Sequence, residues 1–266
     1  EVVSLIGESG SGKSTIGRMI LGLTSVSAGT LTLDGHPVRA GREYYRHVQG
    51  VFQDPFSCYN PVFKADRVFA LIKQAYYPRV PGAQWADRVE RAVGDVRLDP
   101  RAVLGKYPHQ LSGGQLQRLL IARALLLDLT FLVADEITSM LDASTRIDVL
   151  NLLADLKERG LGVLYITHDI SLGTYLAERT VVLRRGRVVE RGDTQKVFGN
   201  PQHPYTRTLL ASVPRLNLPW TAAEPLPECA FHAAGGTGGD DGRLQESEPD
   251  HFVACAQLPD CGRTTA

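Results

Sequence analysis

The chain reads Gly7-Glu8-Ser9-Gly10-Ser11-Gly12-Lys13-Ser14-Thr15 near its start. This stretch has the G-x-x-x-x-G-K-S spacing of a phosphate-binding loop, or P-loop. Its glycines permit backbone turns that a Cβ would obstruct, so successive N–H groups can point at phosphate oxygens. Lys13 then supplies a positive charge for the β- and γ-phosphates, and the hydroxyl of Ser14 is a ligand for Mg²⁺.

The residues on either side of this loop have the patterns of a strand and a helix. Residues 2–6 form a short apolar run, and Ile16, Met19, Ile20 and Leu23 recur at helical spacing. A strand, this loop and a helix place the phosphates at a helix N-terminus, where the helix dipole favours anions. The alternative is a glycine-rich turn that binds nothing, and the agreement of spacing, strand and helix argues against it.

The composition describes a folded chain without a marked charge. Hydrophobic residues make up 43% of the 266 residues, enough for one large domain or a domain with a subdomain. Lys plus Arg and Asp plus Glu number 29 each, so the net charge gives no general argument for nucleic acid or an anionic membrane surface. We find no apolar run of the roughly 18 residues that span a bilayer. Four cysteines suggest no disulfide framework, which favours a reducing cytosol.

Apolar runs that alternate with helical patterns predict an α/β sheet. Strands are expected at 48–52, 131–134 and 163–166, and hairpins around Asp34-Gly35 and Arg185-Gly186. A long block of helical periodicity interrupts this alternation. We therefore predict an α/β fold, a P-loop NTPase sheet core with an inserted helical subdomain at about 54–127.

Polar residues follow four of the predicted strands. Gly7, Gln53, Asp135 and His168 each come directly after an apolar run, and phosphate chemistry is expected at the carboxyl ends of parallel strands. Taken singly, Gln53 reads as a surface residue, His168 as a structural histidine and Asp135-Glu136 as a solvated acidic pair. Their occurrence as a set favours function instead.

With these motifs in this order, the chain resembles the nucleotide-binding subunit of an ATP-binding cassette (ABC) transporter. The resemblance extends from residue 1 to about 214 and implies ATP hydrolysis with ATP and Mg²⁺ bound. It implies an ABC ATPase domain at 1–216, followed by a partly flexible extension at 217–266. The motifs are the P-loop, Gln53, Leu111-Ser112-Gly113-Gly114-Gln115, Asp135-Glu136, Ser139-Met140-Leu141-Asp142 and His168.

The resemblance also implies a role for each motif. Glu136 is the general base that polarises the attacking water, Gln53 touches the metal or water and links to the membrane subunit, and His168 contacts the γ-phosphate. The metal shell is formed by Ser14, Gln53 and Asp135. The residues implied in nucleotide binding are Gly7, Glu8, Ser9, Gly10, Ser11, Gly12, Lys13, Ser14, Thr15, Ser112, Gly113, Gly114 and Gln115.

The segment of Ser112, Gly113 and Gly114 resembles the family's signature motif. That motif caps the nucleotide of the opposite subunit, so the resemblance implies a head-to-tail dimer with a second ATPase subunit. Whether that subunit is identical or different stays open. Asp142 resembles the aspartate at this dimer contact.

Three further stretches resemble importers of oligopeptides, dipeptides and nickel. They are Gln53-Asp54-Pro55-Phe56 with Asn60-Pro61, then Tyr107-Pro108-His109-Gln110, and Asn200-Pro201-Gln202-His203-Pro204-Tyr205-Thr206-Arg207-Thr208-Leu209-Leu210. The last stretch alone also reads as a loop leading into a surface helix.

The implied function is an ATP-hydrolysing subunit that powers import of peptides or a related small solute. Its implied partners are transmembrane permease subunits and an extracytoplasmic solute-binding protein, and no nucleic acid is expected. The subunit is expected peripherally on the cytoplasmic face of the cell membrane. The alternative is an ABC-type ATPase of a non-transport cytosolic assembly, and the transported substrate stays open.

Several positions depart from the family pattern. Ile137 stands where proline is usual, and Met140 stands where alanine is usual. The chain begins inside the P-loop strand, so we expect a preceding segment that supplies the residue stacking on adenine.

The family often carries a four-cysteine segment near its end. Cys229, Cys255 and Cys261 are the candidates here, with His232 or His251 as possible nitrogen ligands. We expect reduced thiols in a flexible tail, because ordering the glycine-rich loop between the cysteines is costly. An iron–sulfur cluster or zinc site is the alternative.

Overall fold

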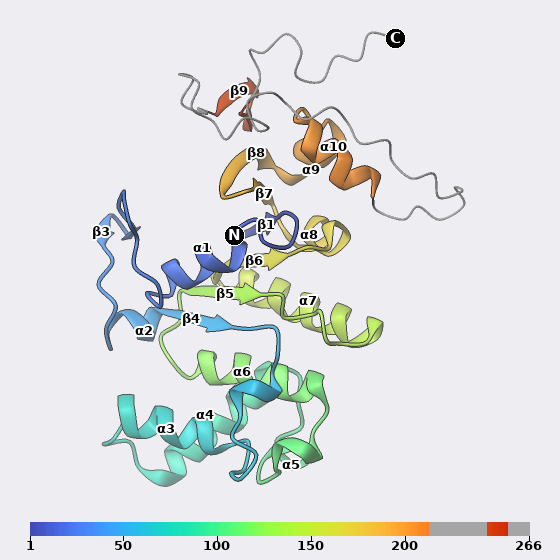
Figure 1. The fold of residues 1–266 in the computed structure, drawn as a ribbon. Helices are drawn as coiled ribbons and strands as arrows, with labels where there is room; N and C mark the ends of the chain where they lie inside the picture. Colours follow the sequence, from blue (N-terminus) through green and yellow to red (C-terminus); the bar gives the residue numbers. More distant parts are fainter. Residues whose placement is uncertain (213–243, 255–266) are drawn as a thin grey trace. The chain divides into compact units, whose positions relative to one another are not determined.

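The structure is a computed structural model that describes residues 1–212 and 244–254 (Figure 1). The chain divides into a first unit, Glu1–Ile16 with Tyr165–Ala266, and a second unit, Gly17–Leu164. Helix α1 (Lys13–Ile20) and strand β6 (Gly162–Thr167) each run across a boundary between them. The predicted glycine-rich stretch at 235–242 lies outside the described residues, as do Cys229, His232, Cys255 and Cys261.

The first unit is built on a mixed sheet. Its strands lie in the order β1 (Val2–Ile6), β7 (Arg179–Arg184), β8 (Arg187–Asp193), β10 (His251–Val253) and β9 (Gln245–Glu248). β1 pairs with β7 in parallel, with Leu5 opposite Val181. The remaining pairs, β7–β8, β8–β10 and β10–β9, are antiparallel.

The predicted hairpin at Arg185-Gly186 is confirmed, because these two residues join the antiparallel strands β7 and β8. Both residues have positive φ, 47° and 79°. This is the conformation in which a two-residue turn follows the right-handed twist of the strands.

The helices of the first unit begin at polar caps. They are α8 (Ile170–Leu176), α9 (Thr194–Gly199) and α10 (Pro204–Ala211). Asp169 caps α8, Asp193 caps α9, and the Nδ1 atom of His203 accepts from the backbone N–H of Tyr205 at the start of α10. Such caps satisfy N–H groups that have no partner within the helix. No sequence pattern had predicted α8 or α9.

The second unit contains a parallel pair of strands and a small hairpin. β4 (Val48–Val51) pairs with β5 (Phe131–Asp135), with Gly50 opposite Val133. The hairpin joins β2 (Thr32–Leu33) to β3 (His36–Pro37). Asp34 and Gly35 form its turn at positive φ, which confirms the hairpin predicted there.

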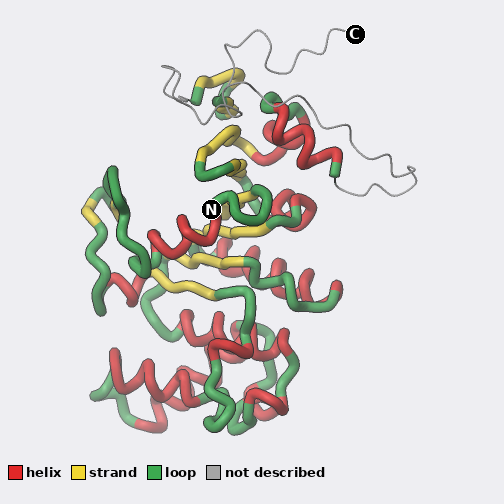
Figure 2. Tube along the Cα trace, viewed as in Figure 1, coloured by secondary structure: helices red, strands yellow, loops and turns green. Residues whose placement is uncertain are grey.

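The other elements of the second unit are helices, which Figure 2 shows in red. They are α2 (Tyr44–His47), α3 (Arg67–Tyr76), α4 (Gly82–Asp95), α5 (Pro100–Val103), α6 (Gly113–Leu125) and α7 (Ala143–Glu158). α3, α4 and α7 all contact α6, and this explains why α6 is buried on most of its faces. Helices α3 to α6 occupy the block that the sequence predicted as helical, and its standing as a separate subdomain stays a prediction.

Residues 244–254 form a hairpin of two strands inside the predicted extension. A buried polar cluster attaches this hairpin to β8. His251 and Glu190 are both fully buried, and Nε2 of His251 lies 2.7 Å from Oε1 of Glu190. Glu190 also accepts the backbone N–H groups of Gln202, at 2.8 Å, and His203, at 3.0 Å. Both carboxylate oxygens of Glu190 therefore have partners.

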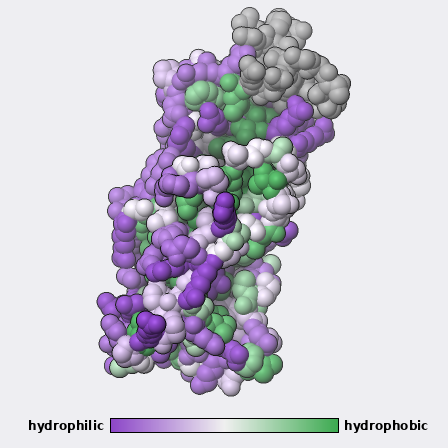
Figure 3. Space-filling view, turned by 90° about the vertical axis from the view of Figure 1, so that its left-hand side faces the viewer, coloured by the Kyte–Doolittle hydropathy of each residue, from purple (hydrophilic) through white to green (hydrophobic). Residues whose placement is uncertain are grey.

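The face that Figure 3 shows carries a mixture of hydrophilic and hydrophobic residues. Among the described residues, no helix combines the length and the apolar character that crossing a bilayer requires.

His251→Ala should lower the free energy of unfolding by about 3 kcal/mol, because Glu190 would stay buried with one partner fewer. Urea unfolding of the full chain, followed by circular dichroism, measures this change. His36→Ala is the control, since His36 is exposed and such substitutions change stability by about 0.5 kcal/mol at most. Equal stability of His251→Ala and the unmodified chain would contradict a structural role for the cluster.

The contact of α6 with α7 leaves no space for a side chain at Gly114. A Cβ there would lie 2.4 Å from Cγ2 of Thr145, whereas the next atoms of Thr145 lie at 3.6 and 3.8 Å. The crowding therefore comes from one methyl group. Thr145→Ser removes this methyl and keeps the hydroxyl, which donates to Asp142 at 2.8 Å.

We expect Gly114→Ala to destabilise the chain by about 1–3 kcal/mol through overpacking. In the Thr145→Ser background the same substitution should cost much less. Thermal unfolding of the two single variants and the double variant gives the coupling between the sites. The same loss in both backgrounds would show that this methyl group is not the obstacle.

Candidate functional site

The loop between β1 and α1 depends on its glycines for two different reasons. Gly10 and Gly12 have φ values of +81° and +104°, which L-residues with a Cβ rarely adopt. Gly7 is required by a close approach instead, because a Cβ would lie 2.1 Å from the carbonyl oxygen of Leu183 on β7. A second contact, from the N–H of Gly186 to the carbonyl of Ser11 at 2.8 Å, attaches the loop to the turn after β7.

Lys13 lies folded over this loop. Its Nζ donates to the carbonyl oxygens of Gly7, at 2.7 Å, and Glu8, at 2.9 Å, and the residue is only 5% exposed. The hydroxyl of Ser11 is also buried and has no hydrogen-bond partner within the described residues. A buried hydroxyl without a partner is costly, so a ligand that bonds it here would be favoured.

The loop therefore fits a chain of phosphates. A buried amine, an unsatisfied hydroxyl and the N-terminus of α1 all belong to the same nine residues. Oxygen anions are the groups that satisfy this set of donors. Glu8, Ser9, Ser14 and Thr15 are exposed at this loop, as a site open to a ligand from solution requires.

His168 belongs to the first unit and follows β6 directly. Its side chain is exposed. The next residue, Asp169, caps α8 by accepting from the N–H groups of Ser171, at 2.9 Å, and Leu172, at 3.3 Å. The backbone of His168 is therefore held on both sides, by the end of β6 before it and by the capped start of α8 after it.

Asp135 and Glu136 belong to the second unit, at the end of β5. Asp135 is the last residue of the strand and is 8% exposed. Glu136 has φ 50°, a left-handed conformation that costs a residue with a Cβ about 1–2 kcal/mol. The N–H and hydroxyl of Ser139 hold it there by donating to its carbonyl, at 3.1 and 2.9 Å. Such strain at a polar residue suggests a functional position.

The two departures from the family pattern are accommodated differently. Ile137 is 1% exposed and packs in the core, whereas Met140 is 60% exposed. Neither residue replaces a polar group of the site.

Gln53 is exposed and lies two residues beyond β4. The preceding residue, Phe52, is held by a hydrogen bond from α6. The fully buried side chain of Gln117 donates to the carbonyl of Phe52 at 3.2 Å. Gln53 thus projects from an anchored strand end.

Ser112 and Gln115 form a reciprocal cap at the start of α6. The side chain of Ser112 accepts from the N–H of Gln115 at 3.2 Å, and the side chain of Gln115 accepts from the N–H of Ser112 at 2.9 Å. Gly113 differs from Gly114, because a Cβ at Gly113 would meet other atoms only at 3.7 Å and beyond.

Asp142 caps α7. Its carboxylate accepts from the hydroxyl of Ser144 at 2.6 Å, and from the N–H and hydroxyl of Thr145 at 3.0 and 2.8 Å. These bonds, with that of Ser144 the strongest, hold the pKa of Asp142 well below its usual range.

The predicted site residues are divided between the two units. The P-loop residues 7–15 and His168 lie in the first unit. Gln53, residues 112–115, Asp135, Glu136 and Asp142 lie in the second unit. Within each unit the structure places these residues at strand ends or at helix starts.

Tyr205, which no sequence motif had marked as a site residue, lies beside the P-loop. The hydroxyl of Tyr205 accepts from the backbone N–H of Glu8 at 2.9 Å, across 197 positions of sequence. The only signal was its place in the stretch at 200–210, which resembled importers without indicating a role.

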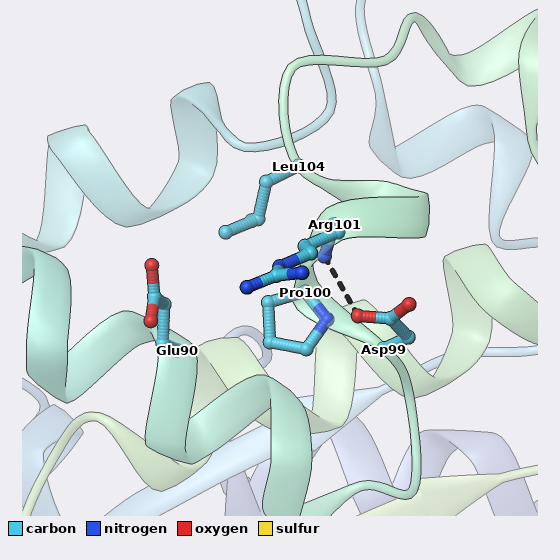
Figure 4. Close-up of a pocket in the computed structure, with 5 residues that line it drawn as sticks. All are labelled: Glu90, Asp99, Pro100, Arg101 and Leu104. Carbon is cyan, nitrogen blue, oxygen red and sulfur yellow. Dashed lines mark hydrogen bonds between the residues drawn. The ribbon is translucent and has the colours of Figure 1, made fainter.

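The second unit also contains a cavity of about 440 Å³, which Figure 4 shows between α4 and the α5 segment. It is lined by Glu90, Asp99, Pro100, Arg101 and Leu104. Asp99 is engaged in capping α5, since it accepts from the N–H of Arg101 at 2.9 Å. None of these five residues belongs to the predicted site.

Two family models match the chain. The model described as ABC transporter matches residues 1–139. The model described as the C-terminal region of oligopeptide/dipeptide transporters matches residues 189–234.

Curated relatives share more than a third of the sequence. A Brucella ovis protein named as a peptide import ATP-binding protein is 38% identical, over 96% of this chain and 87% of its own length. The oligopeptide transport ATP-binding protein OppF of Streptococcus pyogenes serotype M1 is 39% identical, over 80% of this chain and 72% of its own.

Solved structures agree with this relationship. CbiO1 from Clostridium perfringens, part of an ABC transporter complex, matches with a TM-score of 0.67 and 28% identity, over 75% of this chain and 80% of that one. The ATP-binding cassette MJ0796, as a post-hydrolysis dimer bound to ADP and Pi, matches with a TM-score of 0.65 and 30% identity, over 73% of this chain and 85% of that one.

The predicted fold class is confirmed by these structures, as a mixed α/β core with the architecture of ABC ATPases. From the family match and the relatives together, this chain is a nucleotide-binding ATPase that belongs to the ABC transporter family.

Proposed function

We propose that this chain is the ATP-hydrolysing subunit that powers import of peptides, or of a related small solute, through a membrane permease. The observation that carries the chemistry is the P-loop, with Lys13 held over two backbone carbonyls and a buried, unsatisfied Ser11 hydroxyl. The printed names of the relatives support peptide import over the alternative, an ATPase of a non-transport cytosolic assembly.

Nucleotide binding would use donors that the loop already presents. Backbone N–H groups at the start of α1 and the Ser11 hydroxyl would bond phosphate oxygens. The amine of Lys13 would exchange the carbonyls of Gly7 and Glu8 for the β- and γ-phosphates, a stronger, charge-assisted interaction. The loop is thus ready for the ligand at the cost of one side-chain movement.

Ser14, Asp135 and Gln53 are the residues that would hold Mg²⁺. They present a hydroxyl, a carboxylate and an amide oxygen, and Mg²⁺ prefers oxygen ligands. When bound, the ion neutralises charge that develops on the β- and γ-phosphate oxygens.

Glu136 would act as the general base. It would take a proton from water as the water oxygen forms a bond to the γ-phosphorus. The bond from that phosphorus to the bridging oxygen breaks, and ADP leaves with the bonding electrons. His168 would contact the γ-phosphate, and the held backbone of Glu136 would keep the carboxylate in place for each turnover.

A second ATPase subunit, identical or different, would complete the site in a head-to-tail dimer. Ser112 is exposed and Gly113 has space around it, which suits contact with a nucleotide held by the partner. Gly114 and Asp142 also have a role within their own chain, because Gly114 packs against Thr145 and Asp142 accepts the N–H of Thr145. Gly114 would still contact the partner's nucleotide through its backbone, and Asp142 would lie at the dimer contact.

The transport function implies permease subunits as partners and a peripheral place on the cytoplasmic face of the membrane. An extracytoplasmic solute-binding protein would deliver the solute, and no nucleic acid takes part. We also propose the domain division suggested by the sequence, an ATPase domain at 1–216 with a helical subdomain at about 54–127.

Glu136→Gln should slow ATP hydrolysis by at least about 10²-fold while ATP binding is kept, because the base is lost and the phosphate contacts stay. Phosphate release and titration with a fluorescent ATP analogue measure the two properties. Glu158→Gln is the matched control, as Glu158 lies at the exposed end of α7. Near-normal turnover in Glu136→Gln would refute the proposed base.

The transport half of the proposal is tested by copurification. A tagged full chain, recovered from membranes solubilised in mild detergent, should retain a protein with several membrane spans at a fixed ratio. Recovery with soluble proteins alone, at a fixed ratio, would favour the cytosolic assembly instead.

A further inference from the structure

We propose that Tyr205 is a positioning residue of the nucleotide site, whose hydroxyl fixes the peptide group that holds Lys13. The inference rests on the proposed function, because it assigns a role beside the P-loop. All of the contacts that carry it lie within the first unit.

The peptide group that joins Gly7 to Glu8 is bonded at both of its ends. Its N–H donates to the hydroxyl of Tyr205 at 2.9 Å, and its carbonyl accepts from Nζ of Lys13 at 2.7 Å. In a planar trans peptide the N–H and the carbonyl point in opposite directions. Rotation of this plane would therefore stretch both bonds at once.

The peptide group between Gly7 and Glu8 needs these two hydrogen bonds because the backbone of Gly7 does not determine its orientation. The approach of the Leu183 carbonyl excludes a Cβ at Gly7, so the residue must be glycine. Glycine permits many more backbone conformations than other residues, which leaves the following peptide plane weakly determined. A hydrogen bond from outside the loop compensates for this freedom.

Tyr205 is itself rigidly placed. Its ring is 8% exposed and packs with Val182, Val189 and Val197. The guanidinium of Arg184 lies over the ring, 5.0 Å from its centroid. Burial raises the pKa of Tyr205, so the hydroxyl is neutral at physiological pH and can accept the N–H of Glu8.

The backbone of Tyr205 is fixed by the buried cluster around Glu190. The N–H of Tyr205 donates to Nδ1 of His203 at 3.0 Å, and the N–H of His203 donates to Glu190 at 3.0 Å. Glu190 is bonded in turn to His251 of the C-terminal hairpin. Tyr205 lies in the region 189–234, which matches the C-terminal region of oligopeptide/dipeptide transporters. The hydrogen bond of its hydroxyl to Glu8 therefore connects this region to the P-loop.

The consequence concerns affinity more than chemistry. When Lys13 turns to a phosphate, the peptide loses one of its two bonds, and the bond to Tyr205 keeps it oriented. Without the hydroxyl, the loop must be ordered at the time of binding, and this cost weakens binding. The hydroxyl bonds to the backbone of the loop and takes no part in the proposed proton transfer, so the rate of hydrolysis from the bound state should change little.

Tyr205→Phe is the test, because it removes the hydroxyl and keeps the ring. In the full chain we expect the Kd for MgATP and the KM of hydrolysis to rise about 3- to 10-fold, the usual effect of one hydrogen bond. The kcat should stay within about 2-fold of the unmodified chain. Amide hydrogen exchange of the peptide covering residues 7–12, measured without nucleotide by mass spectrometry, should become faster.

Tyr44→Phe is the matched control, since Tyr44 also donates a hydroxyl hydrogen bond, to the carbonyl of Ile20 at the end of α1. It should leave Kd, KM and the exchange of residues 7–12 unchanged. An equal rise in Tyr44→Phe would overturn the proposal, as would an unchanged Kd in Tyr205→Phe, or a fall in kcat alone.

Lys13→Ala separates this proposal from the function on which it rests. Loss of MgATP binding in Lys13→Ala together with normal binding in Tyr205→Phe would overturn the role of Tyr205 and keep the site. Normal binding in Lys13→Ala would overturn the proposed nucleotide site itself, and the role of Tyr205 with it. Tyr205→Phe could also melt at a lower temperature. In that case the amide exchange rate of residues 7–12 is measured at 10 °C, where the variant is still folded, and an unchanged rate there would overturn the role of Tyr205.

Discussion

The close approach of β7 to the first residue of the P-loop is the constraint on which the nucleotide site depends. The carbonyl of Leu183 occupies the space of a side chain at Gly7. This approach follows from the parallel pairing of β1 with β7, which places Ile6 opposite Val182. The pairing therefore decides where the loop starts, and the glycine that it requires leaves a peptide that other groups must orient. Lys13 and Tyr205 are those groups.

In the second unit, close packing likewise requires a glycine at the start of α6. Gly114 has no side chain because α7 needs the space for Thr145, and Thr145 in turn donates its N–H and hydroxyl to Asp142. The starts of two helices are thus fixed by one small cluster. Beside it Ser112 is exposed and Gly113 is half-buried, so the first part of the signature segment stays accessible while Gly114 packs against α7.

The features that could be predicted from sequence were those that depend on near neighbours. The apolar run that became β5, the helical spacing of α1 and the two hairpin turns each involve a few consecutive residues. The glycine pattern of the P-loop belongs to the same class. In each case local periodicity or a required φ value determines the structure without reference to distant parts of the chain.

The features that could not be predicted join distant residues or oppose the usual patterns. The bond between Glu8 and Tyr205 spans 197 positions, and no local pattern reports it. β9 is composed of Gln245-Glu246-Ser247-Glu248, which has no apolar alternation. Glu190 is charged by type and yet fully buried, because three partners from two distant segments, Gln202 with His203 and His251, satisfy it. Sequence reasoning that places charged residues on the surface fails at such a position.

Asp142 shows how a motif residue can have a structural function that differs from the one its position suggests. Its three hydrogen bonds lower its pKa, so the ionised form stabilises the folded state at neutral pH. A carboxyl whose folded pKa is depressed contributes stability above its unfolded pKa, and this contribution is lost as the pH falls through the folded value. That loss lies below the usual carboxyl range, so the cap of α7 stays intact throughout the physiological range.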